Sequence, residues 1–111
     1  MPHMVISYAK PLEDQLDVQQ LVQTVWDAAD KTGLFNPAAI KVRALPVDHF
    51  LTANTDQLFV HVDAKLFGGR AGEQKQAMIS QLFDSIDALV AGDVSISVEA
   101  IDIDKANYLK R

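Results

Sequence analysis

The clearest candidate for chemistry stands at the start of the chain, where Pro2 follows Met1. An initiator methionine is removed before proline, so we expect the mature chain to begin with a secondary amine at Pro2. An uncharged amine accepts a proton, and a general base works best when its pKa lies near the working pH. A free α-amino group has an ordinary pKa of ~8, which burial and nearby cations lower. The alternative is a plain Met-Pro start with a frayed terminus.

Three basic side chains stand where they could hold an acidic ligand. Arg70 follows Gly68 and Gly69, and glycines permit close approach of the backbone to a ligand. An arginine grips a carboxylate through two parallel hydrogen bonds. Lys41 and Arg43 lie two positions apart on a predicted strand and therefore project to one face. The alternatives are a solvated arginine in a flexible loop and a charged strand edge that resists aggregation.

The other residues that could bind metals or act as nucleophiles give a weaker pattern. The only histidines are His3, His49 and His61, and none lies four positions from another, as a helical metal site would require. We therefore expect no metal site, with His61 facing solvent or a neighbouring subunit. The chain has no cysteine, which excludes disulfides, thiol nucleophiles and cysteine-ligated zinc. The acidic residues near the end are interpreted as a solvated edge: Glu99, Asp102 and Asp104.

The composition of the chain argues against several classes of protein. The 111 residues suit one domain spanning 1–111, and 49% of them are apolar, which is enough for a core. The net charge of −5 argues against a nucleic-acid-binding protein, because phosphate contacts need clustered Lys and Arg. No apolar run approaches the ~20 residues of a membrane span, and the first residues do not resemble a signal peptide. Together with the absence of cysteine, this predicts a cytoplasmic protein.

The spacing of apolar residues predicts two helices and four strands. The first helix is expected between an N-cap at Asp17 and a stop at Gly33. The second carries an apolar stripe from Met78 to Val90 and ends before Gly92.

The strands are expected at about 2–8, 39–47, 58–66 and 94–103. In the last of these strands the apolar positions change from even to odd numbers, and a β-bulge near Glu99 or Ala100 would restore the alternation.

The order of these elements predicts an α/β (α+β) fold built from two consecutive βαβ units. The halves span about 2–50 and 56–104, and the two strands of each half should be parallel. One four-stranded sheet with both helices on one face is the simplest assembly. We expect the opposite face to be apolar and to be buried against another copy of the chain.

Several stretches in this order resemble one family. They are Met1 to Val5, Gly33 to Phe50, and Phe59 to Val62 followed by Gly69 to Lys75. Together they resemble 5-carboxymethyl-2-hydroxymuconate Δ-isomerase over nearly the whole chain. This family is a branch of the tautomerase superfamily, which includes 4-oxalocrotonate tautomerase and macrophage migration inhibitory factor. The resemblance implies a trimer whose sheets line a central barrel, no metal, no organic cofactor, and proton transfer by Pro2.

The resemblance also implies roles for the basic residues. The arginine that follows the family's glycines falls on Arg70, and the arginine cluster of the second strand falls on Lys41 and Arg43. Lys41 stands where an arginine is expected, and a lysine lacks the planar fork of the guanidinium. The C-terminal residues 106–111 also depart from the family ending.

The expected function is therefore that of a cofactor-independent isomerase. It would move a proton within an unsaturated 2-hydroxy or 2-oxo dicarboxylate like 5-carboxymethyl-2-hydroxymuconate, in the breakdown of aromatic compounds. Pro2 would be the general acid and base, with Arg43 and Arg70 also catalytic and Lys41, Arg43 and Arg70 binding the small anionic substrate.

Two alternatives remain open from the sequence. The first is a hydratase or dehalogenase that uses the same proline and a carboxylate, such as Glu99 or Asp102, to activate water. The second is a non-catalytic trimeric binding protein.

Overall fold

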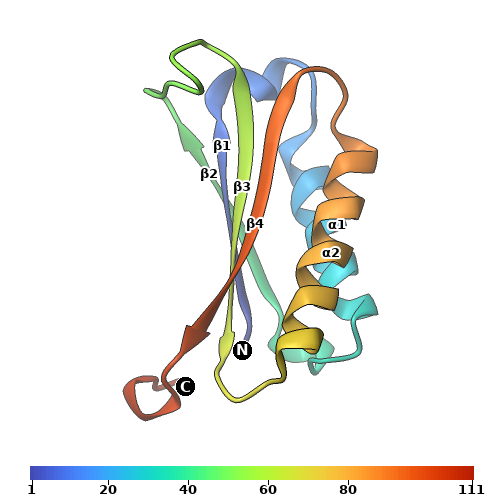
Figure 1. Ribbon diagram of the computed structural model, residues 1–111, viewed down its shortest axis with the longest axis vertical. Helices are drawn as coiled ribbons and strands as arrows, with labels where there is room; N and C mark the ends of the chain where they lie inside the picture. The colour runs from blue at the N-terminus through green and yellow to red at the C-terminus, as the bar shows by residue number, and fades with distance from the viewer.

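A four-stranded sheet, covered on one face by two α-helices, makes up the body of the computed structural model, which describes residues 1–111 (Figure 1). The elements follow the chain as β1 (His3–Ala9), α1 (Val18–Lys31), β2 (Lys41–Val47), β3 (Leu58–Phe67), α2 (Gly72–Leu89) and β4 (Val94–Ile103). Short 3₁₀ turns span Lys10–Asp14, Pro37–Ala39 and Lys105–Asn107. The predicted order of two strand–helix–strand units is confirmed.

The sheet has the strand order β2-β1-β3-β4. Within each half the two strands are parallel, β1 with β2 and β3 with β4. The halves meet where β1 pairs with β3 in antiparallel fashion. The sheet is therefore mixed, and the predicted α+β fold with both helices on one face is confirmed.

Even-numbered residues of the central strands form the core. Met4 and Ile6 of β1 are fully buried, as are Val60, Val62 and Ala64 of β3. These side chains face the helices, where Leu21, Val25, Met78, Leu82 and Ile86 complete a cluster of 17 buried residues. Because successive side chains of a strand point to opposite faces, the odd-numbered residues of β1 and β3 project from the other side of the sheet, here called the open face.

Local capping explains where α1 begins and ends. The Asp17 carboxylate accepts a hydrogen bond of 3.0 Å from the Gln19 N–H, which makes it the predicted N-cap of α1. Gly33 has φ of +70° and stops the same helix, as expected for the residue that follows a C-cap.

No helix combines the length and the apolarity that crossing a membrane requires.

The predicted bulge in β4 is wrong. β3 and β4 pair without interruption from Leu58 opposite Val94 to Phe67 opposite Ile103. Val94, Ile96, Val98 and Ala100 pack against the core. The change from even to odd apolar positions has another cause. Ile101 and Ile103 lie on the open face, so the apolar residues of β4 face the helices in its first part and the open face near its end, while the strand stays regular.

The open face is also more polar than expected. Its centre carries the hydrogen-bonded side chains of His61, Asp63, Ser97 and Glu99. Apolar residues lie toward its two ends, with Phe59 against Phe50 at one end and Phe67 against Tyr108 at the other. The expectation that this face is apolar is wrong at its centre, because β3 alternates an apolar face with a polar one.

We expect the change from leucine to alanine to affect stability differently at a buried position and at an exposed one. Leu82→Ala removes a fully buried side chain and should lower the free energy of unfolding by about 2–5 kcal/mol. The matched change Leu51→Ala removes a side chain that is 73% exposed and should alter it by no more than about 0.5 kcal/mol. Urea unfolding followed by circular dichroism measures both, and equal losses would contradict this description of the core.

Candidate active site

The N-terminal segment is fixed at the end of the sheet. The Pro2 side chain is fully buried, and its carbonyl oxygen accepts a hydrogen bond of 3.1 Å from the Lys41 N–H. The Met1 amine donates to the Ala39 carbonyl at 3.2 Å, and Lys41 Nζ donates to the same oxygen at 3.0 Å. The start of the chain is therefore held against the beginning of β2 and is not frayed.

Cations surround this terminus. Burial, followed by the charge and hydrogen bond of Lys41 and then the charge of Lys110, lowers the pKa of the Met1 amine below its ordinary value of 8.0. Both effects favour the uncharged amine. Positive charge therefore gathers around the start of the chain, although the chain as a whole is anionic.

Lys41 and Arg43 share the open face with His3, as their spacing predicts. His3 lies opposite Lys41 in the register of β1 and β2, and Arg43 Nη1 lies 3.0 Å from His3 Nδ1. A guanidinium can only donate, so Nδ1 accepts and the ring proton of neutral His3 is on Nε2. Burial, then Arg43, Lys41, the terminal amine and Lys65, lower the pKa of His3.

The C-terminal segment closes over this end of the open face. Tyr108 Oη lies 2.9 Å from His3 Nε2, which donates to it in the neutral tautomer described above. The Tyr108 ring also packs edge-on against Phe67, with 5.4 Å between ring centroids. Neither His3 nor Tyr108 was a candidate from the sequence. His3 is odd-numbered, like Lys41, so the alternation of the two strands indicates that both lie on the same face of the sheet. No local pattern in the sequence indicates Tyr108.

Arg70 lies at the same end of the molecule but has different contacts. Its Nη2 donates to the Leu34 carbonyl at 2.9 Å, and its guanidinium lies 5.2 Å from the centre of the Phe35 ring. The loop between β3 and α2 and the N-terminus are both at the lower end of Figure 1. The structure thus brings Lys41 and Arg43 together beside the terminus and binds Arg70 to the loop that follows α1.

The carboxylates suggested for water activation have other partners. Asp102 forms an ion pair of 3.3 Å with Lys75 of α2, and Glu99 lies 3.2 Å from His61 in the centre of the open face. Neither contact involves the N-terminal segment.

The surface of one chain does not enclose the candidate residues. Its three hollows have volumes of about 220, 240 and 290 Å³. The largest is lined by residues of α2 and of the loop that follows α1. None is lined by Pro2, Lys41, Arg43 or Arg70.

Solved structures share this fold. A 5-carboxymethyl-2-hydroxymuconate delta-isomerase has a TM-score of 0.89 at 20% identity, over 100% of this chain and 88% of its own. A protein solved after inactivation by 2-oxo-3-pentynoate has a TM-score of 0.80 at 23% identity, over 96% and 89%. A fused 4-OT, solved as a symmetric trimer, has a TM-score of 0.69 at 20% identity, over 96% and 94%.

Sequence comparison assigns the family. No curated protein sequence matches the chain. The family model described as 5-carboxymethyl-2-hydroxymuconate isomerase matches residues 2–111. The match begins at Pro2 and includes both βαβ units, all four strands and the C-terminal segment. The chain therefore belongs to the 5-carboxymethyl-2-hydroxymuconate isomerase family and is an isomerase with the tautomerase fold.

Proposed function

We propose that this isomerase moves a proton within an unsaturated 2-hydroxy or 2-oxo dicarboxylate, with the amine of Pro2 as base once Met1 has been removed. The observation that carries the proposal is the position of Pro2, which is buried directly before β1 and next to the Met1 amine whose pKa Lys41 helps to lower. A compound like 5-carboxymethyl-2-hydroxymuconate, formed in the breakdown of aromatic compounds, has the charges and the conjugation that this site suits.

The proposed reaction is a proton transfer in two steps. Neutral Pro2 takes a proton from the substrate, and the electron pair left behind spreads through the conjugated system as a dienolate. The protonated amine then returns the proton to another carbon, so the enzyme ends in its starting state. This chemistry requires no oxidant and no organic cofactor.

The basic residues would stabilise the charge that develops during this transfer. Arg43 and Lys41 share the open face beside the terminus, so they suit the oxygen atoms nearest the reacting carbon. Arg70 keeps free N–H groups beyond its bond to Leu34, and these could hold the distant carboxylate.

A homotrimer would complete the site. The candidate residues line no hollow on one chain, and the open face has no helix over it (Figure 1). A fused 4-OT of the same fold was solved as a symmetric trimer. In such an assembly a neighbouring copy would supply the missing wall around Pro2.

The first prediction of the proposed mechanism concerns Pro2. Intact-mass measurement should show that Met1 is absent. Pro2→Ala, or a tag that blocks the amine, should lower kcat/KM for muconate-like substrates at least ~100-fold, because a positioned base supplies about 10²–10⁴ in rate. Treatment with 2-oxo-3-pentynoate, an alkynyl ketone that adds amines, should place its adduct on Pro2.

Pro11→Ala is the matched control, since Pro11 is exposed in a 3₁₀ turn. It should retain wild-type turnover. Full turnover by the Pro2→Ala variant or by the tagged protein would eliminate the proline mechanism.

The second prediction is a pH dependence. Lys41 lowers the pKa of the Met1 amine. Once Met1 is removed, Pro2 carries the terminal amine, and we expect Lys41 to lower the pKa of that amine in the same way, so that the base is uncharged, and active, at lower pH than an ordinary amine. In Lys41→Gln that pKa should rise, and the ascending limb of kcat/KM against pH should move to higher pH. Lys31→Gln, an exposed change at the end of α1, is the control. If the ascending limb of the pH profile is unchanged in Lys41→Gln, Lys41 does not lower the pKa of the base.

The third prediction concerns Arg43. Its removal in Arg43→Ala should raise KM by about 10- to 100-fold, the loss of one charge-assisted hydrogen bond. It should also raise the pKa of His3, because Arg43 is the largest charge that lowers it. NMR titration of the imidazole protons measures the second effect without substrate. A pKa of His3 unchanged by the substitution would contradict the geometry described above.

A further inference from the structure

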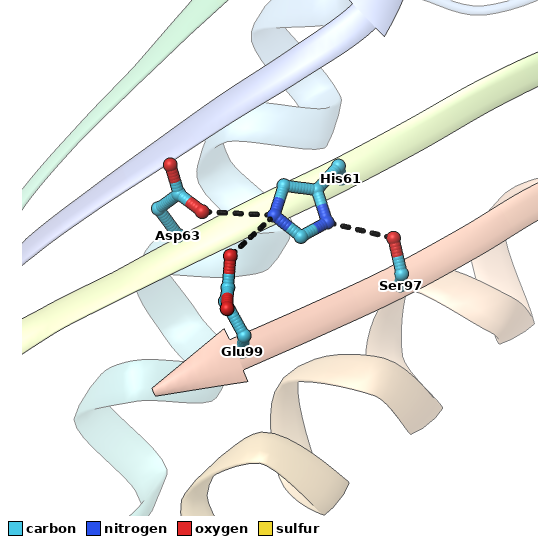
Figure 2. Close-up of polar contacts among 4 residues, drawn as sticks. All are labelled: His61, Asp63, Ser97 and Glu99. Atoms are coloured by element: carbon cyan, nitrogen blue, oxygen red, sulfur yellow. Dashed lines mark hydrogen bonds and ion pairs between the residues drawn. The ribbon is translucent and has the colours of Figure 1, made fainter. Parts of the chain in front are cut away.

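The centre of the open face holds a polar cluster separate from the N-terminal site. His61 and Asp63 project from β3, and Glu99 and Ser97 from the adjacent β4 (Figure 2). His61 Nε2 lies 2.8 Å from Asp63 Oδ1 and 3.2 Å from Glu99 Oε1. On the other side of the ring, Nδ1 lies 2.7 Å from Ser97 Oγ.

The pairing of the strands explains why these four side chains meet. His61 and Asp63 are two positions apart on one strand, so they share a face. The parallel register sets Ser97 opposite His61 and Glu99 opposite Asp63. Across β1, Ser7 lies opposite His61, four positions or about 13 Å along the strand from His3. The cluster is therefore distinct from the residues around Pro2.

The charges in the cluster are unbalanced. Two carboxylates converge on one imidazole nitrogen, and no Lys or Arg nitrogen lies within ion-pair distance of either one. A carboxylate oxygen only accepts hydrogen bonds. A positive charge between the three groups would therefore balance the two carboxylates. Either a proton on Nε2 or a metal ion can supply that charge.

We propose that His61, Asp63 and Glu99 form a site for a divalent transition-metal ion such as Zn²⁺ or Mn²⁺. Metal–ligand bonds of about 2.0–2.2 Å place neighbouring ligand atoms roughly 2.8–3.6 Å apart, and the two separations from Nε2 fall within that range. All three ligand atoms lie within 4.8 Å of one another. Glu99 is 59% exposed, so its carboxylate can turn to complete the set.

Ser97 gives the imidazole its orientation. When Ser97 Oγ accepts from the Nδ1–H group, the lone pair of Nε2 faces the two carboxylates, as a histidine ligand requires. Such a contact behind a metal-binding histidine fixes its tautomer and raises its affinity. The imidazole favours a transition metal over Mg²⁺ or Ca²⁺, which prefer oxygen ligands.

The sequence-based expectation of no metal site rested on the spacing of the histidines and on the family resemblance, and neither considers residues that meet across two strands. The pattern that points to this site is a histidine and an aspartate two apart on a strand, together with a glutamate on the neighbouring strand. The first part is visible in the sequence, whereas the second depends on the register of β3 and β4.

Metal titration of the whole protein tests the proposal. After treatment with a chelator and dialysis, the chain should take up one Zn²⁺ or Mn²⁺ per chain in isothermal titration calorimetry at neutral pH, and Mg²⁺ should not compete. His61→Gln should abolish this binding, and Ser97→Ala should weaken it by roughly 10- to 100-fold. His49→Gln, the same change at an exposed histidine, should leave it intact.

Circular dichroism of each variant checks that it is folded. If the wild-type protein binds neither ion, the cluster is a proton-bridged hydrogen-bond network and the proposal is wrong. Binding that survives in folded His61→Gln would also overturn it. The stoichiometry is counted per chain and needs no substrate, so neither outcome depends on the proposed isomerase chemistry.

Discussion

The antiparallel pairing of β1 with β3 is the constraint on which the other features depend. It joins the two βαβ halves and sets Met4 and Ile6 beside Val62 and Ala64, all fully buried beneath the helices. A slip of one residue would turn these apolar side chains outward. The same register therefore fixes which residues reach the open face, among them His3 and His61.

The open face carries two polar sites of different charge, one around the N-terminus and one around His61. They differ because different strands bring their charged residues to each. Basic residues of β2 and the terminal amine converge at one end, where burial and then their charges lower the pKa of His3. Carboxylates of β3 and β4 converge at the centre. A chain with a net charge of −5 thereby presents a cationic end suited to an acidic substrate.

Much of the fold is predictable from the sequence because its signals are local. The alternation in β3, the N-cap at Asp17 and the stop at Gly33 each depend on a few neighbouring residues, and the structure agrees with all three. The bulge in β4 was predicted wrongly, because alternation assumes one apolar face along the whole strand. Ile101 and Ile103 break that assumption by lying on the open face while the pairing continues.

The sequence by itself determined the elements, the family and the shared face of Lys41 and Arg43, since two positions on a strand always point the same way. Only the tertiary structure decided which distant residues meet. His3 contacts Tyr108 across 105 positions of the chain, and His61 contacts Glu99 across 38. These contacts follow from strand register and from the path of the C-terminal segment, which are set by packing of the whole core and leave no local pattern.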